Sequence, residues 1–256
     1  MLTIATTDPA PPSSRRSETA RPTEPATLPG PVLRFRRLAA AGGPPEFETI
    51  RLETSGTIHR PRMPPIPLRI TMAHRLGKAF AHDIRIGVRR LSFRFGLDAF
   101  VDGRGVMKIG PSVQSGPKFD RGALIAMWGE ALSFPDSWDR QPGLRWEPVD
   151  ETTALLLIPW AGEAIPITVG FDPETGYPVR CHADRYKGDG PLVGWAGLFA
   201  DWQSWPGGIL APALMQAWWD DEPAPWLDIH LERLEVDVPI EATLELGRRA
   251  LAEGRF

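Results

Sequence analysis

Several features are scarce or absent in this chain. Cys181 is its only cysteine, asparagine does not occur, and no long apolar run is present. A single cysteine excludes an internal disulfide and a four-thiolate metal site. No stretch approaches the roughly 18 apolar residues of a membrane-spanning helix. The opening residues lack a basic segment followed by an apolar stretch, so we expect no secretory signal. Together these features predict a cytoplasmic location.

Lysine is also scarce, because 25 of the 29 basic residues are arginine and only 4 are lysine. Such usage is typical of codon bias, so each arginine is weak evidence for anion binding. Residues 1–95 carry 16 basic and 7 acidic side chains, a net charge of +9, whereas residues 96–256 carry 13 and 25, a net of −12. No nucleic-acid motif accompanies the basic half. We therefore expect strand arginines on solvent faces, neutralised by the acidic half, and no nucleic-acid partner.

Cofactor-binding motifs are missing too. Gly103-Arg104-Gly105 and Gly188-Asp189-Gly190 lack the spacing of dinucleotide or phosphate loops. Neither His-Glu-x-x-His nor Gly-x-Ser-x-Gly occurs. The sequence therefore predicts no cofactor, and it disfavours the common nucleotide-dependent and hydrolase classes.

The chain divides into a tail and one domain. Residues 1–27 are rich in proline and poor in apolar side chains, which predicts a disordered tail. Residues 28–256 are expected to form a single antiparallel β domain. A short helix opens it, with Val32, Phe35 and Leu38 on one face, and the segment 42–45 ends that helix.

From residue 46 onward the hydrophobic period is two, as in Leu68, Ile70 and Met72, which alternate with polar neighbours. The alternation breaks near residues 120–134, where an apolar stripe predicts an inserted helix with Asp120 as its N-cap. A third, closing helix is predicted over 240–253. About ten strands predict a mainly β (α+β) fold, a large curved antiparallel sheet or half-barrel that the inserted helix covers. A pocket between sheet and helix would follow from this geometry.

Several different short motifs are spread along this domain. They are Leu28-Pro29-Gly30-Pro31-Val32-Leu33-Arg34, Ser55-Gly56, Asp102-Gly103-Arg104-Gly105, Trp128-Gly129-Glu130-Ala131 with Phe134-Pro135, Arg145-Trp146-Glu147, Asp150 with Ala154, and Ala183-Asp184-Arg185-Tyr186. Over residues 28–240 the set resembles a bacterial family known only as a domain of unknown function. The resemblance implies organisation and no activity. In architecture the chain is similar, by analogy, to the half-barrel of bacterial lipoprotein carriers, an open sheet around helices.

Glu130 lies on the inserted helix, two residues from Trp128, so the two side chains cannot share a face. If Glu130 points inward it needs a partner, because an unpaired buried carboxylate is costly. Arg185 or His182 is the expected partner. Such a pair could tie the helix to the sheet, or it could contact a ligand, and the sequence leaves both open.

The strand around residue 184 carries a second group of candidates. By alternation His182, Asp184 and Tyr186 face one side, and Cys181 and Arg185 face the other. The polar trio suits acid–base chemistry or ligand binding. It suits a solvent face equally well.

Two further histidines lie on either side of Gly77. If Gly77 centres a hairpin, His74 and His82 are diagonal neighbours that could supply two metal ligands. The alternative places both on a solvent-facing side of the sheet, and on that interpretation we expect no metal site.

Tryptophan is abundant, with ten residues, six of them between Trp195 and Trp226. This density exceeds what packing usually needs. One hypothesis is a pocket lined by Trp128, Trp146 and Trp195, with Glu130, Arg185 and Tyr186 contacting a polar end of the ligand. The other is that these rings only fill the core.

The sequence therefore favours a protein that binds an apolar or aromatic small molecule. One alternative is a cofactor-independent enzyme with Glu130 or His182 as general base. Another is a structural or interaction module.

Overall fold

The computed structural model describes residues 28–41, 47–87 and 92–253. The tail at 1–27 and the turn at 42–45, for which the sequence makes predictions, lie outside the described residues.

Thirteen strands and three α-helices occur in the described part of the chain. The strands are β1 (Thr49–Ile58), β2 (Ile66–Arg75), β3 (Ala79–Ile86), β4 (Phe93–Val101), β5 (Arg104–Ile109), β6 (Ser112–Ser115), β7 (Arg145–Pro148), β8 (Thr153–Trp160), β9 (Glu163–Phe171), β10 (Pro178–Tyr186), β11 (Leu192–Trp205), β12 (Ile209–Trp219) and β13 (Leu227–Val236). The helices are α1 (Gly30–Ala40), α2 (Pro117–Ala131) and α3 (Glu241–Glu253), and the 3-10 helix η2 covers Pro135–Arg140.

All thirteen strands form one sheet in the order β6-β5-β4-β3-β2-β1-β13-β12-β11-β10-β9-β8-β7. Each pair of neighbours is antiparallel. The chain starts at the centre of the sheet, reaches the β6 edge, and crosses to the β7 edge through α2 and η2. It then returns to the centre, where β13 pairs with β1. The fold is therefore an open, mainly β half-barrel whose inserted helix connects the two edge strands.

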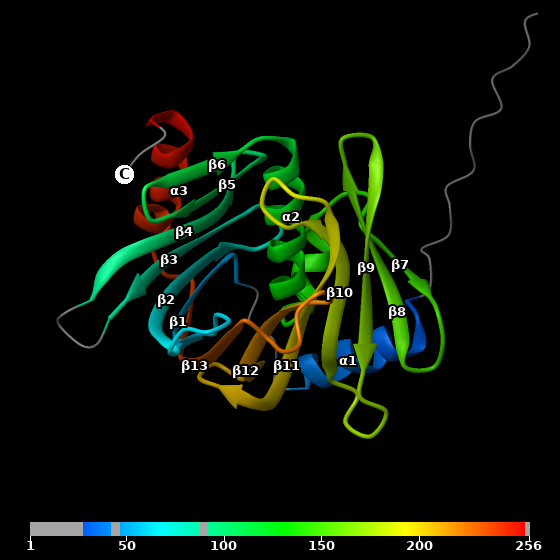
Figure 1. Ribbon diagram of the computed structural model, residues 1–256. Coiled ribbons are helices and arrows are strands. Elements are labelled where there is room, and N and C mark those ends of the chain that lie inside the picture. The colour runs from blue at the N-terminus through cyan, green and yellow to red at the C-terminus, as the bar shows by residue number, and fades with distance from the viewer. Residues whose placement is uncertain (1–27, 42–46, 88–91, 254–256) are drawn as a thin grey trace, which may run out of the picture.

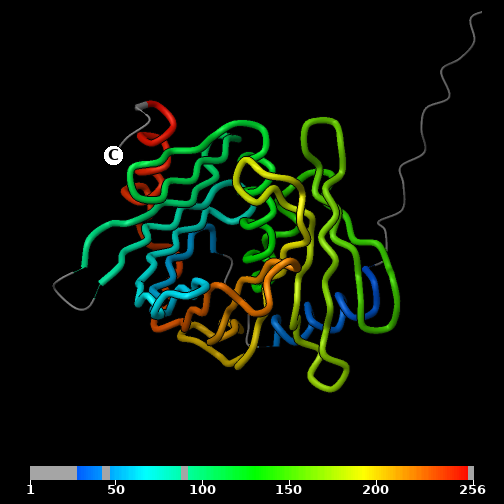
Figure 2. The backbone as a smooth tube through the Cα atoms, in the orientation of Figure 1, coloured from blue at the N-terminus to red at the C-terminus, as the bar shows by residue number. Residues whose placement is uncertain are grey.

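Helix α2 lies in the hollow of the curved sheet (Figures 1 and 2). It contacts β4, β5 and β6 on one side and β9 and β10 on the other. This position explains why nearly every residue from Gly122 to Ala131 is buried. None of the helices in the described part is long and apolar enough to cross a membrane.

The start of α2 differs from the prediction. The helix begins at Pro117 after Gly116, so Asp120 is not its N-cap. The Asp120 carboxylate instead accepts the backbone N–H of Gly105 on β5, at 2.7 Å. A Cβ on Gly105 would lie 2.3 Å from the Phe119 carbonyl oxygen, so glycine is required where β5 passes the first turn of α2.

The other two helices pack elsewhere. Helix α1 buries Val32 and Phe35, while Leu38 on the same predicted face is 36% exposed. Helix α3 packs on β2 to β5 from the opposite face of the sheet to α2, through a small apolar cluster that includes Ala81, Leu97 and Leu244. The sheet is thus covered by helices on both faces around β3 and β4.

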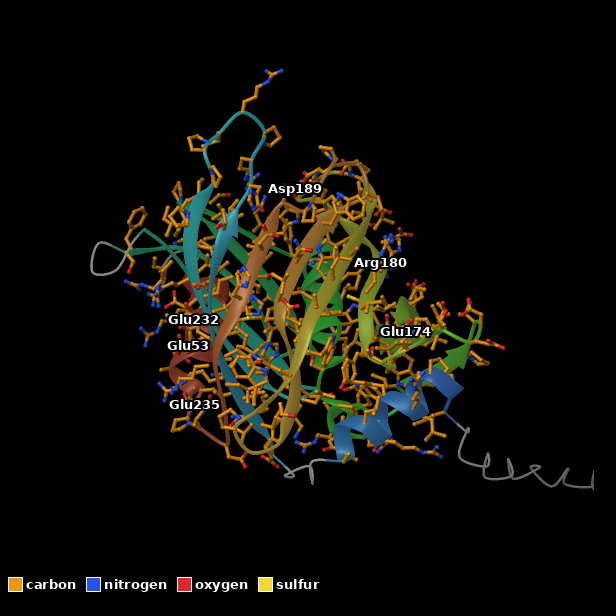
Figure 3. All side chains as sticks on the ribbon, turned by 90° about the horizontal axis from the view of Figure 1, so that it is seen from below. Glu53, Glu174, Arg180, Asp189, Glu232 and Glu235 are labelled. Carbon is orange, nitrogen blue, oxygen red and sulfur yellow. The ribbon has the colours of Figure 1, made fainter. Side chains whose placement is uncertain are left out.

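Charged side chains on the strands and helices pair across the two halves of the sequence. The pairs are Arg51 with Glu235, Arg69 with Glu232, Arg75 with Glu241, and Arg36 with Asp139. Figure 3 shows Glu53, Glu232 and Glu235 along the neighbouring strands β1 and β13. These contacts provide the neutralisation expected from the uneven charge distribution.

Candidate functional site

A cluster of three titratable residues, two buried and one partly buried, lies between α2 and the sheet. His74 on β2 and His82 on β3 are 1% and 7% exposed. Both direct Nε2 toward the carboxylate of Glu130 on α2, at 2.8 Å from His74 and 3.0 Å from His82. The register pairs Met72 with His82 and His74 with Phe80, so the histidines are diagonal neighbours, as expected. The expectation that they face solvent is wrong.

The two histidine contacts differ in kind. His82 makes a hydrogen bond to Glu130. His74 Nε2 is just as close, but its direction does not suit a hydrogen bond, and this buried atom has no hydrogen-bond partner. The His74 ring instead stacks on Phe80, with centroids 5.7 Å apart. The partners of Glu130 are therefore these histidines, and not the Arg185 or His182 that the sequence suggested.

The cluster shifts the protonation of its members. Burial by itself would raise the pKa of Glu130, but the charge on His82 and the contacts with both histidines outweigh burial and lower the pKa to about 2. Burial opposes the charged form of His82, yet the Glu130 carboxylate raises its pKa above 6.5. A carboxylate with so low a pKa is a weak base at neutral pH. This counts against Glu130 as the general base considered from the sequence.

Two more charged groups extend the cluster. Asp98 on β4 lies directly across from His82 in the sheet. Burial raises the pKa of Asp98, although the charges of Arg185 and His82 partly oppose this. Arg185 on β10 is 8% exposed, and burial lowers its pKa despite the nearby charges of Asp98 and Glu130. Its guanidinium stacks 4.6 Å from the Trp195 ring, and its Nε is buried without a hydrogen-bond partner.

Arg185 and Asp98 both line a cavity of about 250 Å³. The cavity lies where α2 begins, between β4–β6 and the strands β10 and β12. Its wall is mostly apolar, with a few charged groups. The apolar and aromatic residues are Val106, Met107, Ile109, Phe119, Tyr186, Trp219 and Trp226, and the charged ones include Lys118 and Lys187.

A second, smaller cavity of about 70 Å³ adjoins Glu130. Trp195, Cys181 and Met72 contribute to its wall, so it lies deeper between α2 and the sheet. Arg185 lines the larger cavity and Trp195 the smaller one, and the two side chains stack on each other. The stacked pair therefore lies between the two cavities.

Not all the tryptophans predicted to line a pocket do so. Trp128 is 1% exposed, and its ring packs near the turn at Gly77. Trp146 lies against Trp138, with ring centroids 4.9 Å apart, beside a separate recess next to Leu28. Arg185, Tyr186, Trp195 and Glu130 line the two adjoining cavities, whereas Trp128 and Trp146 do not.

His182 lies away from this site. Its Nε2 is 2.8 Å from the Asp220 carboxylate, and the pair packs over Gly194. On β10, Cys181 and Arg185 are buried while Asp184 is exposed, so the expected alternation of faces is confirmed. The position of His182 gives it no contact with a ligand in either cavity, so a general-base role there finds no support.

Comparison with known protein families identifies one that matches this chain. Residues 18–229 match a family of unknown function, DUF6544. The chain belongs to this family. Among curated proteins, no relative is found.

Solved structures similar to this DUF6544 member include the following two. A LolA superfamily protein from Nitrosomonas europaea is 8% identical, with a TM-score of 0.44, and the match covers 77% of this chain and 90% of that one. A DUF1329 family protein from Desulfovibrio piger is 16% identical, with a TM-score of 0.42, and the match covers 85% and 98%.

Sequence reasoning about this DUF6544 member named His74 and His82 as possible metal ligands but did not place them against Glu130, and it missed Asp98. A signal existed for all three. His74 continues the alternation of Leu68, Ile70 and Met72, and His82 has the same parity as Ile84 and Ile86. Both therefore belong on the apolar side of their strands. Asp98 follows from the same rule, because the next residue of its parity, Phe100, is buried.

Proposed function

We propose that this protein binds a small molecule with an apolar or aromatic body and an anionic end, a carboxylate, in the cavity of about 250 Å³. The observation that carries the proposal is the Arg185 guanidinium, buried at the cavity wall and stacked on Trp195. A carboxylate can accept two parallel hydrogen bonds from the arginine fork.

Arg185 is buried and its Nε has no hydrogen-bond partner, and this favours an anionic group on the ligand. A buried charge is costly unless it is paired and hydrogen-bonded. Asp98 acts on Arg185 electrostatically, but burial raises the pKa of Asp98 and so weakens it as a counter-ion. Gly122 on α2 lies close to the guanidinium, since a Cβ there would lie 3.4 Å from Arg185 Nη2. A ligand carboxylate would complete this pairing.

The rest of the wall favours an apolar body. Trp219 and Trp226 come from the tryptophan-rich segment, and Phe119 and Met107 contribute from α2 and β5. Ligand pockets typically combine such an apolar lining with a few polar groups that fix the orientation of the ligand. Lys118 also lines the cavity and adds positive charge to it, whereas Lys187 in the same wall is paired with Asp221 and Glu222.

The test compares probes that differ only at the polar end. Octanoate and phenylacetate are titrated against the full chain by calorimetry and thermal shift, with octanol and octylamine as matched neutral and cationic probes. We expect the carboxylates to bind and to raise Tm, and the other two to bind more weakly. Arg185→Gln should weaken carboxylate binding by about 10- to 100-fold, which corresponds to about 1.5 to 3 kcal/mol for a hydrogen bond to a charged group.

Arg180→Gln is the matched control, because Arg180 is on the same strand and also lies over a tryptophan, Trp218, at 5.9 Å. Its side chain is 44% exposed and does not line the cavity. This variant should bind like the wild type. Equal binding of octanoate and octanol, or an unchanged Arg185→Gln, would contradict the anionic end.

Native mass spectrometry of the protein purified from its own cells, before and after denaturation, would identify a retained ligand. The cytoplasmic location expected from the sequence stays a prediction.

A further inference from the structure

His74, His82 and Glu130 together form a set of metal-binding side chains. We propose that Nε2 of His74, Nε2 of His82 and the Glu130 carboxylate bind one divalent first-row transition-metal ion, such as zinc or ferrous iron. This site is separate from the Arg185 cavity, and the inference does not rest on the proposed binding function.

The first support is geometric. The three ligand atoms lie within 4.8 Å of one another. They come from three elements, β2, β3 and α2, so the fold fixes their convergence. Zinc bonds to nitrogen and oxygen are about 2.0 to 2.2 Å long, which places tetrahedral ligand atoms about 3.3 Å apart. The two nitrogens lie 2.8 and 3.0 Å from the carboxylate oxygen, so these two separations would each lengthen by only a few tenths of an ångström around an ion.

The second support is an unpartnered buried atom. His74 Nε2 is aimed at the cluster but makes no hydrogen bond, although the residue is only 1% exposed. An unsatisfied buried polar atom is destabilising, and native cores contain few of them. In the metal-free triad this nitrogen has an ion-pair contact with Glu130 at 2.8 Å and no well-directed hydrogen bond. An ion bound between the two Nε2 atoms and the Glu130 carboxylate would instead use the lone pairs of both histidines.

The donor chemistry narrows the class of ion. Two imidazoles and one carboxylate are the donors of His2Glu zinc sites and of the two-histidine, one-carboxylate sites of ferrous iron. Both keep at least one coordination position open. The cavity of about 70 Å³ adjoins Glu130 and has room for a water molecule as a further ligand.

The experiment uses the full chain, stripped with EDTA and then dialysed against Zn²⁺, Co²⁺ or, without oxygen, Fe²⁺. We expect one ion per chain by elemental mass spectrometry, a rise in Tm, and visible Co²⁺ absorption bands of nitrogen and oxygen ligands. His74→Gln and Glu130→Gln should each weaken binding by roughly 100-fold or more, because even outer-shell partners of a metal site are worth about 10- to 100-fold.

His59→Gln and His182→Gln are matched controls. Each removes a histidine that contacts an aspartate outside the cluster, Asp228 at 2.6 Å and Asp220 at 2.8 Å. Both should keep one ion per chain. If the cluster variants do not fold, the wild-type Co²⁺ spectrum decides. A folded wild type that holds none of the three ions, or cluster variants that bind as well as wild type, would overturn the proposal and leave a proton-bridged cluster.

Discussion

Nε2 of His82 donates a hydrogen bond to the Glu130 carboxylate across 3.0 Å, and this contact links β3 to α2 in the hollow of the sheet. The two residues are 48 positions apart in the sequence. The contact therefore reports directly on whether the inserted helix is docked.

Glu130→Gln should remove a pH-dependent part of the stability in the metal-free protein. The pKa of Glu130 falls from 4.5 to about 2 on folding, so its stabilisation is complete above pH 4.5 and is lost as the pH falls toward 2. A shift of this size corresponds to roughly 3 kcal/mol. The pKa of His82 is raised above 6.5, so its stabilisation is complete below pH 6.5 and is lost as the pH rises through the folded-state value.

Urea unfolding in EDTA from about pH 3 to about pH 9 measures this effect. The Glu130–His82 pair should add most to the free energy of unfolding of the wild type between pH 4.5 and pH 6.5. Glu130→Gln should flatten the dependence of the unfolding free energy on pH at both ends of this range. Asp220→Asn, which alters the His182–Asp220 pair outside the cluster, should not. Parallel pH profiles for wild type and Glu130→Gln would refute this account.

Phe35→Ala should detach α1 from the domain. Phe35 is fully buried, with its ring 5.4 Å from that of Trp202, 6.3 Å from Trp138 and 6.4 Å from Phe171. Truncation of a buried phenylalanine costs about 3 to 5 kcal/mol. Leu38→Ala on the same helix should cost far less, because Leu38 is 36% exposed. Chemical denaturation of both variants measures the difference, and equal losses would count against this packing.

Gly56→Ala should disrupt the junction between β1 and β13. A Cβ at Gly56 would lie 1.9 Å from the Asp228 carbonyl oxygen, so the two strands would have to separate. We expect a loss of about 3 kcal/mol or more, at the upper end of overpacking costs. Gly170→Ala in β9 is the control, since a Cβ there meets nothing within 4 Å. If both variants unfold at the same urea concentration as wild type, the β1–β13 contact is looser than the 1.9 Å approach implies.

Cys181 should resist alkylation in the folded protein. Burial raises the pKa of its thiol to about 12. At pH 8 roughly one thiol in ten thousand is then ionised, and the thiolate is the reactive form. Iodoacetamide should label Cys181 slowly in buffer and rapidly in urea, as mass spectrometry can measure. Rapid labelling of the native protein would mean that the space between α2 and β10 opens readily.

Local patterns made much of the fold predictable. Alternation and turn residues are local signals, and they predict strands over 152–160, 164–171, 177–186 and 226–236, within a residue of β8, β9, β10 and β13. Strand β6 was missed, since Ser112–Ser115 carries no apolar alternation. The inserted helix was predicted over 120–134 and observed over Pro117–Ala131, because Pro117 can occupy the first helical turn, where its missing N–H costs nothing.

The sequence by itself thus determined the mainly antiparallel fold, the inserted helix and the face that Arg185 shares with Cys181. Only the tertiary structure decided which groups meet Glu130. That choice depends on how far the sheet curls and how α2 rotates within it, and both follow from packing between segments far apart in the chain. The same long-range packing brings β1 against β13, pairing Arg51 with Glu235 across 184 positions. Local periodicity carries no information about such pairings, because it fixes the face of each strand and not its neighbour.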